Sequence, residues 1–208
     1  DLLDAKTDAN SIYIGEQSGQ NDDGNNFNVA VGQQSLKDNL SGTRNTSVGH
    51  VSLANNTTGI NNTAIGFQAL VSNQTGSGNF AAGYNSLIVN ENGGGNTAVG
   101  SSSLSMNTGN QNTAIGSNAG GDTQNTSGNI FIGYQSGMNE SNSNRLYIEN
   151  SSSNTPLIWG DFDNDKVIIH GDFTTSGTIQ AYGNTNLGSD LDVDNNISAG
   201  DTIFTNHL

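Results

Sequence analysis

The stretch "NTAIGFQAL" at residues 62–70 returns with small changes as "NTAVGSSSL" at 96–104 and "NTAIGSNAG" at 112–120. Aligned on the Gly in fifth place, the chain carries eight such copies; six of the seven intervals between the glycines are 17 residues and one is 16. A fixed period of this length is the signature of a repeat architecture. The repeat glycines are Gly15, Gly32, Gly49, Gly66, Gly83, Gly100, Gly116 and Gly133.

Each copy predicts a short strand that ends in a bend at the Gly. The first four places alternate between polar and apolar or small residues, and the fourth holds a β-branched residue in most copies, as at Ile65; both features favour a strand. A second apolar column, represented by Leu70, follows five residues later. The runs between copies, such as 55–62, are rich in Asn and Gly and are typical of turns. We expect the two apolar columns to supply the core.

The repeat therefore predicts an all-β fold, a parallel β-solenoid of about eight 17-residue coils. Successive coils would stack as parallel strands about 4.8 Å apart. The repeat Gly would lie where a side chain blocks the bend or a neighbouring backbone. Small residues in third place would form a flat face that another chain can approach closely. Because one coil holds few large apolar residues to offset its ordering, we expect three rolls to associate around one axis. The third-place residues in question are Ala30, Ser47, Ala64, Ala81, Ala98 and Ala114.

Composition narrows the class of protein further. The 208 residues are 31% hydrophobic and carry a net charge of −14, a combination typical of disorder; the fixed period argues against disorder here. The acidic balance argues against direct nucleic-acid binding, which needs a basic surface. There is no cysteine, so no disulfide framework exists. The chain begins at Asp1, and we expect it to be part of a longer protein.

At the level of motifs, "VAVGQQSL", "TAIGFQAL" and "TAVGSSSL" resemble the head repeats of trimeric autotransporter adhesins of the YadA type. The longer period and the segment "RLYIENSSSNTPLIWGDFDNDKVIIHGDF" at 145–173 resemble a variant found in bacterial surface and phage tail-fibre proteins. The resemblance covers residues 11–173 well. It implies a left-handed parallel β-roll, a homotrimer, and attachment to a surface, with Gly120 and Gly137 departing from the second-column Leu.

Four regions are expected on this basis. Residues 1–10 would be an N-terminal linker, 11–140 the β-roll head, 141–173 a β-rich neck, and 174–208 a segment like a fibre shaft. Flanking regions that are missing from this chain would anchor it to a baseplate or a surface. The resemblance implies a location outside the cell, on a bacterial surface, a phage tail or a contractile injection particle.

The place immediately after the repeat Gly is the candidate recognition site. It varies among Glu, Gln, His, Ser and aromatic residues, and it is aromatic at Phe67, Tyr84 and Tyr134. A variable position on a regular scaffold is where a recognition surface can be built. These side chains either stack on sugar rings or contact a receptor, or they fill space between coils or between copies. The sequence does not separate these two interpretations.

No catalytic residue, metal site or cofactor is expected. The run Asp161, Asp163 and Asp165 has the alternating carboxylates of a calcium loop, but Lys166 stands where that loop needs Gly. The run Asp190, Asp192 and Asp194 has a strand-like context. We interpret both runs as solvated acidic segments, although an axial Asp ring in a trimer remains an alternative. The three histidines, His50, His170 and His207, are isolated in sequence.

Three functions compete. The first is a structural and adhesive fibre protein that attaches to a cell-surface receptor or glycan. The second is an ice-binding solenoid, because Thr46, Thr63, Thr97 and Thr113 share one column. The third, ranked last, is a polysaccharide-degrading solenoid enzyme, which needs paired acid and base groups along a groove. We expect a non-enzymatic attachment protein.

Overall fold

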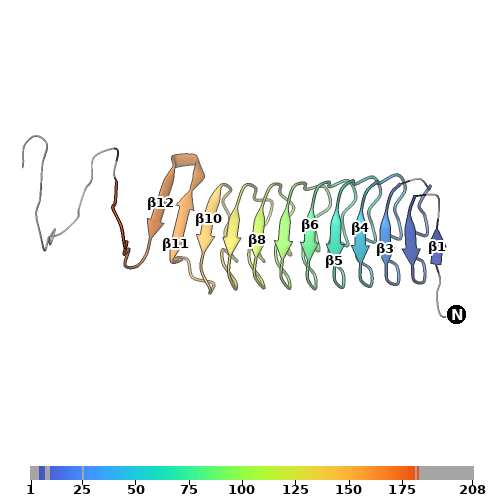
Figure 1. Cartoon of the computed structure of the whole chain (residues 1–208), viewed down its shortest axis with the longest axis horizontal. Helices are drawn as coiled ribbons and strands as arrows, with labels where there is room; N and C mark the ends of the chain where they lie inside the picture. Colours follow the sequence, from blue (N-terminus) through green and yellow to red (C-terminus); the bar gives the residue numbers. More distant parts are fainter. Residues whose placement is uncertain (1–4, 8–9, 25, 181, 183–208) are drawn as a thin grey trace, which may run out of the picture. The chain divides into compact units, whose positions relative to one another are not determined.

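The computed structural model describes residues 5–7, 10–24, 26–180 and 182, and in this part of the chain twelve strands form one sheet in sequence order (Figure 1). Contacts divide the chain into a first unit that ends at Asp172 and a second that begins at Phe173. The strands are β1 (Ala5–Thr7), β2 (Ile12–Ile14), β3 (Val29–Val31), β4 (Thr46–Val48), β5 (Thr63–Ile65), β6 (Phe80–Ala82), β7 (Thr97–Val99), β8 (Thr113–Ile115), β9 (Ile130–Ile132), β10 (Arg145–Ile148), β11 (Ile158–Asp161) and β12 (Lys166–Ile169).

The repeats form a stack of parallel strands. From β2 to β9 each strand pairs in parallel with the strand one repeat later, so that Thr63 faces Thr46 on one side and Phe80 on the other. Equivalent places of successive copies thus lie directly above one another. This confirms the all-β solenoid of about eight coils. The left-handed winding and the trimer stay predictions.

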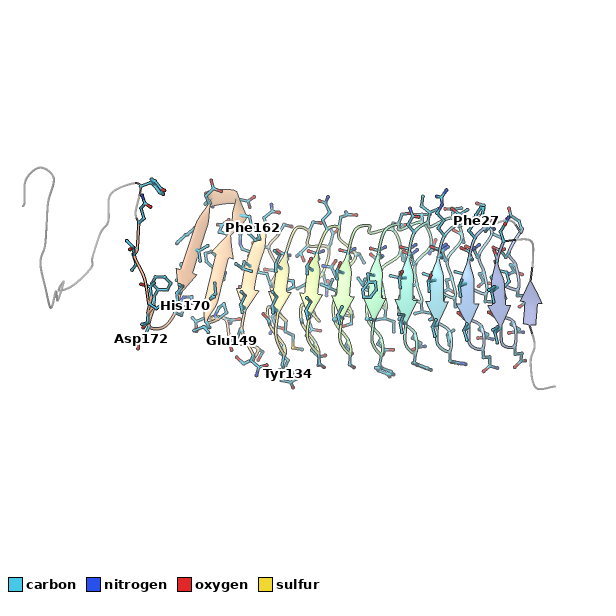
Figure 2. All side chains as sticks on the ribbon, in the orientation of Figure 1. Phe27, Tyr134, Glu149, Phe162, His170 and Asp172 are labelled. Atoms are coloured by element: carbon cyan, nitrogen blue, oxygen red, sulfur yellow. The ribbon has the colours of Figure 1, made fainter. Side chains whose placement is uncertain are left out.

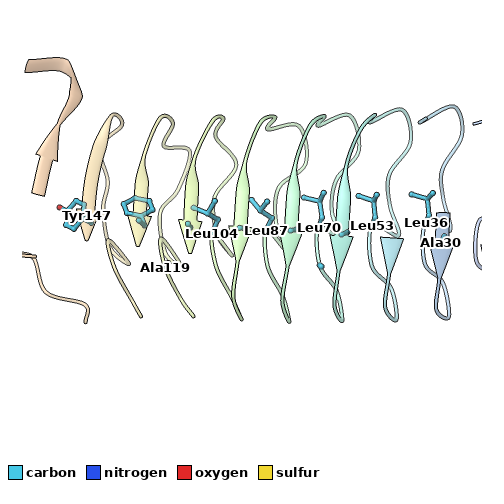
Figure 3. Packing of buried hydrophobic residues seen from close by; sticks show 14 of the residues in the cluster. Ala30, Leu36, Leu53, Leu70, Leu87, Leu104, Ala119 and Tyr147 are labelled. Atoms are coloured by element: carbon cyan, nitrogen blue, oxygen red, sulfur yellow. The ribbon is translucent and has the colours of Figure 1, made fainter. Parts of the chain in front are cut away.

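The core lies between the third and ninth places of the repeat, which is only partly the arrangement expected. Leu70 and its equivalents are fully buried, as predicted, and they pack against the third-place Ala column (Figure 3). The fourth-place column was expected inside, but Ile65 is 43% exposed. The third-place column was expected on a flat outer face, but Ala64 and Ala81 are 0% exposed. Both expectations were wrong, because the strand turns its small residue inward to leave room for Leu.

Two compensating exchanges keep this narrow core filled. Where an aromatic ring replaces Ala in third place, as at Tyr13 and Phe131, Gly replaces Leu in ninth place, at Gly19 and Gly137. A Cβ on Gly19 would lie 2.2 Å from the ring of Tyr13, and a Cβ on Gly137 would lie 2.1 Å from the ring of Phe131. The departures at Gly19 and Gly137 therefore follow from conserving volume in a close-packed interior. Gly120, whose own coil has Ala in third place, leaves room for Phe131 of the next coil, because a Cβ on Gly120 would lie 2.6 Å from that ring.

The fifth-place glycines allow the coils to approach one another. Gly66 has φ +129°, and a Cβ there would lie 2.6 Å from the carbonyl oxygen of Gly83 in the next coil. Each repeat Gly up to Gly116 meets the next one in the same way, and Gly133 meets the backbone of Glu149. The expected role of the repeat Gly is confirmed.

A second part of the interior is polar and was not predicted. The first-place Asn residues are buried: the backbone N–H of Asn62 donates to Oδ1 of Asn45 (2.9 Å), and Nδ2 of Asn62 donates to the Gly76 carbonyl (2.8 Å). A further buried ladder runs from Asn39 to Asn90, in which Nδ2 of Asn73 donates to Oδ1 of Asn56 (2.7 Å). Hydrogen bonds between coils thus stabilise a roll that has few large apolar side chains.

The roll continues beyond its eighth copy. β10 pairs in parallel with β9, with Tyr147 beside Phe131, so the sheet crosses the expected boundary between head and neck without a break. β11 and β12 then extend it as antiparallel strands, and at the other end β1 pairs antiparallel with β2. The expected linker therefore contains a strand. Of the expected shaft, only residues 174–180 and 182 are described.

The tight bend after each Gly predicts a stabilising substitution. Val51 has φ +57°, whereas the same place holds Asn85 and Asn118 in other coils. A β-branched residue in the left-handed region is strained, and Asn tolerates this region better. We expect Val51→Asn to raise the free energy of unfolding by about 1 kcal/mol, measured by urea denaturation at a fixed protein concentration. The control Val48→Asn, placed in a strand, should give no gain; equal effects of the two variants would contradict the explanation.

Candidate functional site

The outer face of the sheet is an exposed apolar surface. Because alternate strand residues point to opposite sides, the second and fourth places face outward wherever the third faces the core. On this outer face Ile65 is 43% exposed, Phe80 40% and Ile115 45%. Its members from β2 to β9 are Ile12, Ile14, Val29, Val31, Thr46, Val48, Thr63, Ile65, Phe80, Ala82, Thr97, Val99, Thr113, Ile115, Ile130 and Ile132.

No member of this outer face from β2 to β9 is charged, although the chain carries 19 acidic residues. The face extends through Leu146 and Ile148 of β10, which pair with Ile130 and Ile132. At this end of the outer face, Ile132 and Ile148 together with Leu157, which is 53% exposed, line a shallow apolar pocket. A large exposed apolar surface on a soluble chain marks an interaction site.

The aromatic candidates divide into a stack and a separate ring. Phe67 lies between His50 and Tyr84, with ring centroids 5.5 Å apart on each side and interplanar angles of 12° and 10°. His50, which is isolated in sequence, is also a member of this stack. Both faces of Phe67 are covered by its neighbours, so a sugar cannot stack on them as the sequence interpretation allowed. The exposed rings are Phe67 at 41% and Tyr84 at 55%.

Tyr134 stands apart from this stack. It is 49% exposed and projects from the lower rim of the roll (Figure 2). Ser101 and Ser117 occupy the same place in the two coils between Tyr84 and Tyr134. Neither the hydroxyl of Tyr84 nor that of Tyr134 forms a hydrogen bond to a described residue of the chain.

The last coil ends in a partly buried Tyr–Glu pair. The hydroxyl of Tyr147 donates to Oε2 of Glu140 (2.6 Å), and Oε1 of Glu140 accepts from the backbone N–H groups of Ser141 and Asn142 (2.8 Å each). Burial, together with the hydrogen bond to Glu140, raises the pKa of Tyr147 to about 12. Burial opposes ionisation of Glu140, but the hydrogen bonds from Tyr147 and Asn142 outweigh it and lower the pKa of this carboxyl. At the first coil, Tyr13 donates to Asp22 (2.5 Å) in the same manner.

This pair predicts a pH dependence. Glu140 stabilises the folded state above its ordinary pKa of 4.5, and this contribution is lost as the pH falls through its lower folded value. Tyr147 contributes fully below 10.0, and its contribution is lost as the pH rises toward about 12. We expect fluorescence of the single Trp, Trp159, which packs against the core beside Tyr147, to report loosening at both limits. In Glu140→Gln the change in Trp159 fluorescence at low pH should become smaller. An unchanged fluorescence change at low pH would contradict the role given to Glu140.

The first Asp run spans a short 3-10 helix, Phe162–Asn164, with Asp161 as its N-cap. Asp161 accepts from the N–H of Asp163 (3.0 Å) and from Nδ2 of Asn164 (2.8 Å), and it forms an ion pair with Arg145 (2.8 Å). These hydrogen bonds, with the nearby guanidinium, lower the pKa of Asp161. Within the described residues no three acidic or His side chains converge as metal ligands. The second run, Asp190, Asp192 and Asp194, lies outside the described residues.

Searches for similar proteins gave no match among protein-family models, curated proteins or solved structures. Within the described part of the chain, no helix is long and apolar enough to cross a membrane. The interpretation of function therefore rests on the residues themselves.

Proposed function

We propose that this chain is the head of a homotrimeric extracellular fibre that attaches to a cell-surface receptor or glycan. The observation that carries the proposal is the uncharged apolar outer face, which follows the sheet from β2 to β10 in a chain of net charge −14. A surface of this kind is buried when copies of the chain associate. Association leaves the loops and the rims of the roll accessible to a receptor.

The resemblance to YadA-type heads and tail-fibre repeats supports the number three and the extracellular setting. It also supports anchoring through flanking regions to a baseplate or a bacterial surface. The expectation of association rests on the outer face, since the third-place Ala column and the buried Asn ladders complete the core of a single roll.

Ice binding has weaker support. Thr46 pairs with Thr63 and Thr97 with Thr113 on the outer face, as the sequence analysis expected. Phe80 occupies the equivalent place between Thr63 and Thr97, and its exposed ring interrupts the Thr column. An unbroken flat array of Thr is therefore lacking. A thermal-hysteresis measurement on the purified chain tests this alternative directly.

The attachment function is tested by adding the fluorescently labelled chain to a panel of bacterial and eukaryotic cells. We expect saturable binding to at least one cell type, and competition by the unlabelled chain. Binding to none of the cells would contradict the proposed function. Release of reducing ends from cell-wall or capsular glycans would instead favour the enzymatic alternative.

A further inference from the structure

The interruption of the aromatic column leaves a defined gap on the surface of the roll. Stacked rings occupy three successive coils at His50, Phe67 and Tyr84, so one coil step accommodates one ring. The next two coils carry only Ser101 and Ser117 in this place, and the ring of Tyr134 follows. At about 4.8 Å per coil, Tyr84 and Tyr134 stand about 14 Å apart. The two coils between them carry no ring in this place.

The chemistry of this gap is uncharged and amphipathic. Phe67 stacks on one face of Tyr84, and the equivalent place of the next coil holds the small residue Ser101. The Ser101 hydroxyl forms no hydrogen bond to a described residue, and the Ser117 hydroxyl accepts only a long bond from Asn118 (3.3 Å). No Lys or Arg occurs at places five to eight of any copy. Aromatic rings at the two ends and hydroxyls between them complement a sugar, which presents apolar C–H faces and hydroxyl edges.

We propose that the Tyr84–Tyr134 gap, formed by Tyr84, Ser101, Ser117 and Tyr134, binds a neutral glycan, one sugar of which stacks on the ring of Tyr84. This inference rests on the proposed attachment function and names its ligand class. Anionic glycans are disfavoured, because the chain is acidic and the gap offers no cation. Phe67 acts as a positioning residue, since its ring stacks on one face of Tyr84 and fixes the orientation of that ring.

The test uses an array of neutral hexose and N-acetylhexosamine oligosaccharides together with sialylated ones. We expect the unmodified chain to bind neutral members. Tyr84→Ser and Tyr134→Ser should each weaken binding about 2- to 12-fold, the range that an aromatic contact contributes. Ser101→Phe should extend the stack into the gap and abolish binding while the roll stays folded. His50→Ser, at the opposite end of the stack, is the matched control and should bind as the unmodified chain does.

The outcomes separate this inference from the proposed function. Binding to cells without binding to any neutral oligosaccharide overturns the glycan gap and leaves attachment standing. Equal binding by Ser101→Phe and the unmodified chain also overturns it. A change in the mass of the assembly on Tyr134→Ser, with glycan binding intact, would reassign Tyr134 to a contact between copies and overturn its place in the gap.

Discussion

Replacing Gly83 by Ala is expected to destabilise the roll by about 2 to 6 kcal/mol, enough to unfold part of it. Two effects add: the φ of +145° is strained for any residue with a Cβ, and the added methyl would lie 2.4 Å from the Gly100 carbonyl oxygen. Backbone strain of this kind costs about 1–3 kcal/mol, and overpacking costs about as much again. Urea denaturation followed by circular dichroism measures the loss.

The control for this variant is Gly78→Ala. Gly78 also has a positive φ, of +70°, but a Cβ there meets nothing closer than the Gly95 backbone N at 3.9 Å. We expect it to cost only about 1 kcal/mol. Equal losses for the two variants would contradict the claim that coil spacing, rather than local backbone conformation, requires the repeat Gly.

Placing a carboxylate on the outer face should dissociate the assembly. Ile65→Asp puts a charge on the middle of a face that carries none, and burying an unpaired charge between copies costs several kcal/mol. Because Ile65 is 43% exposed in the single roll, the isolated chain should stay folded. Sedimentation velocity is expected to show a folded monomer in place of the assembly.

The matched control is Gln74→Asp, which adds the same charge at an exposed position outside the strands. It should leave the mass of the assembly unchanged. If Ile65→Asp remains associated to the same degree as this control, the outer face is not the surface through which copies meet.

The repeat, with its β-branched fourth place and its Gly, was sufficient to predict strands β2 to β9, their stacking and the Gly contacts. A 17-residue repeat places equivalent residues above one another, so the close approach of Gly66 to Gly83 follows from the stack itself. The stacking of Phe67 on Tyr84 follows from the same register, and it was predictable from their shared place in the repeat.

The direction of the strand columns was not predicted, because hydrophobicity favours burial of Ile over Ala, whereas the narrow interior admits only the smaller residue. The opposing Leu70 leaves space only for a small residue, so Ala64 turns inward and Ile65 outward. One signal was present in the sequence: Tyr13 occurs with Gly19, and Phe131 occurs with Gly137. A large residue in third place together with Gly in ninth place indicates that these two places touch.

The buried Asn ladders were missed for a related reason. Asn62 stands beside a turn-rich run, where Asn is commonly solvated. Its burial depends on the Asn45 and Gly76 groups of neighbouring coils that it bonds, and these bonds exist only once the coils are stacked. Within the candidate site, the Ser101–Ser117 interruption was visible in the sequence, but its meaning required the stacked rings beside it.

The central claim is that the roll associates through its uncharged outer face, and the most direct test is the mass of the purified chain in solution. Native mass spectrometry or sedimentation equilibrium is expected to give three times the 21.5 kDa of one chain. A folded species that remains at 21.5 kDa at micromolar concentration would contradict the claim.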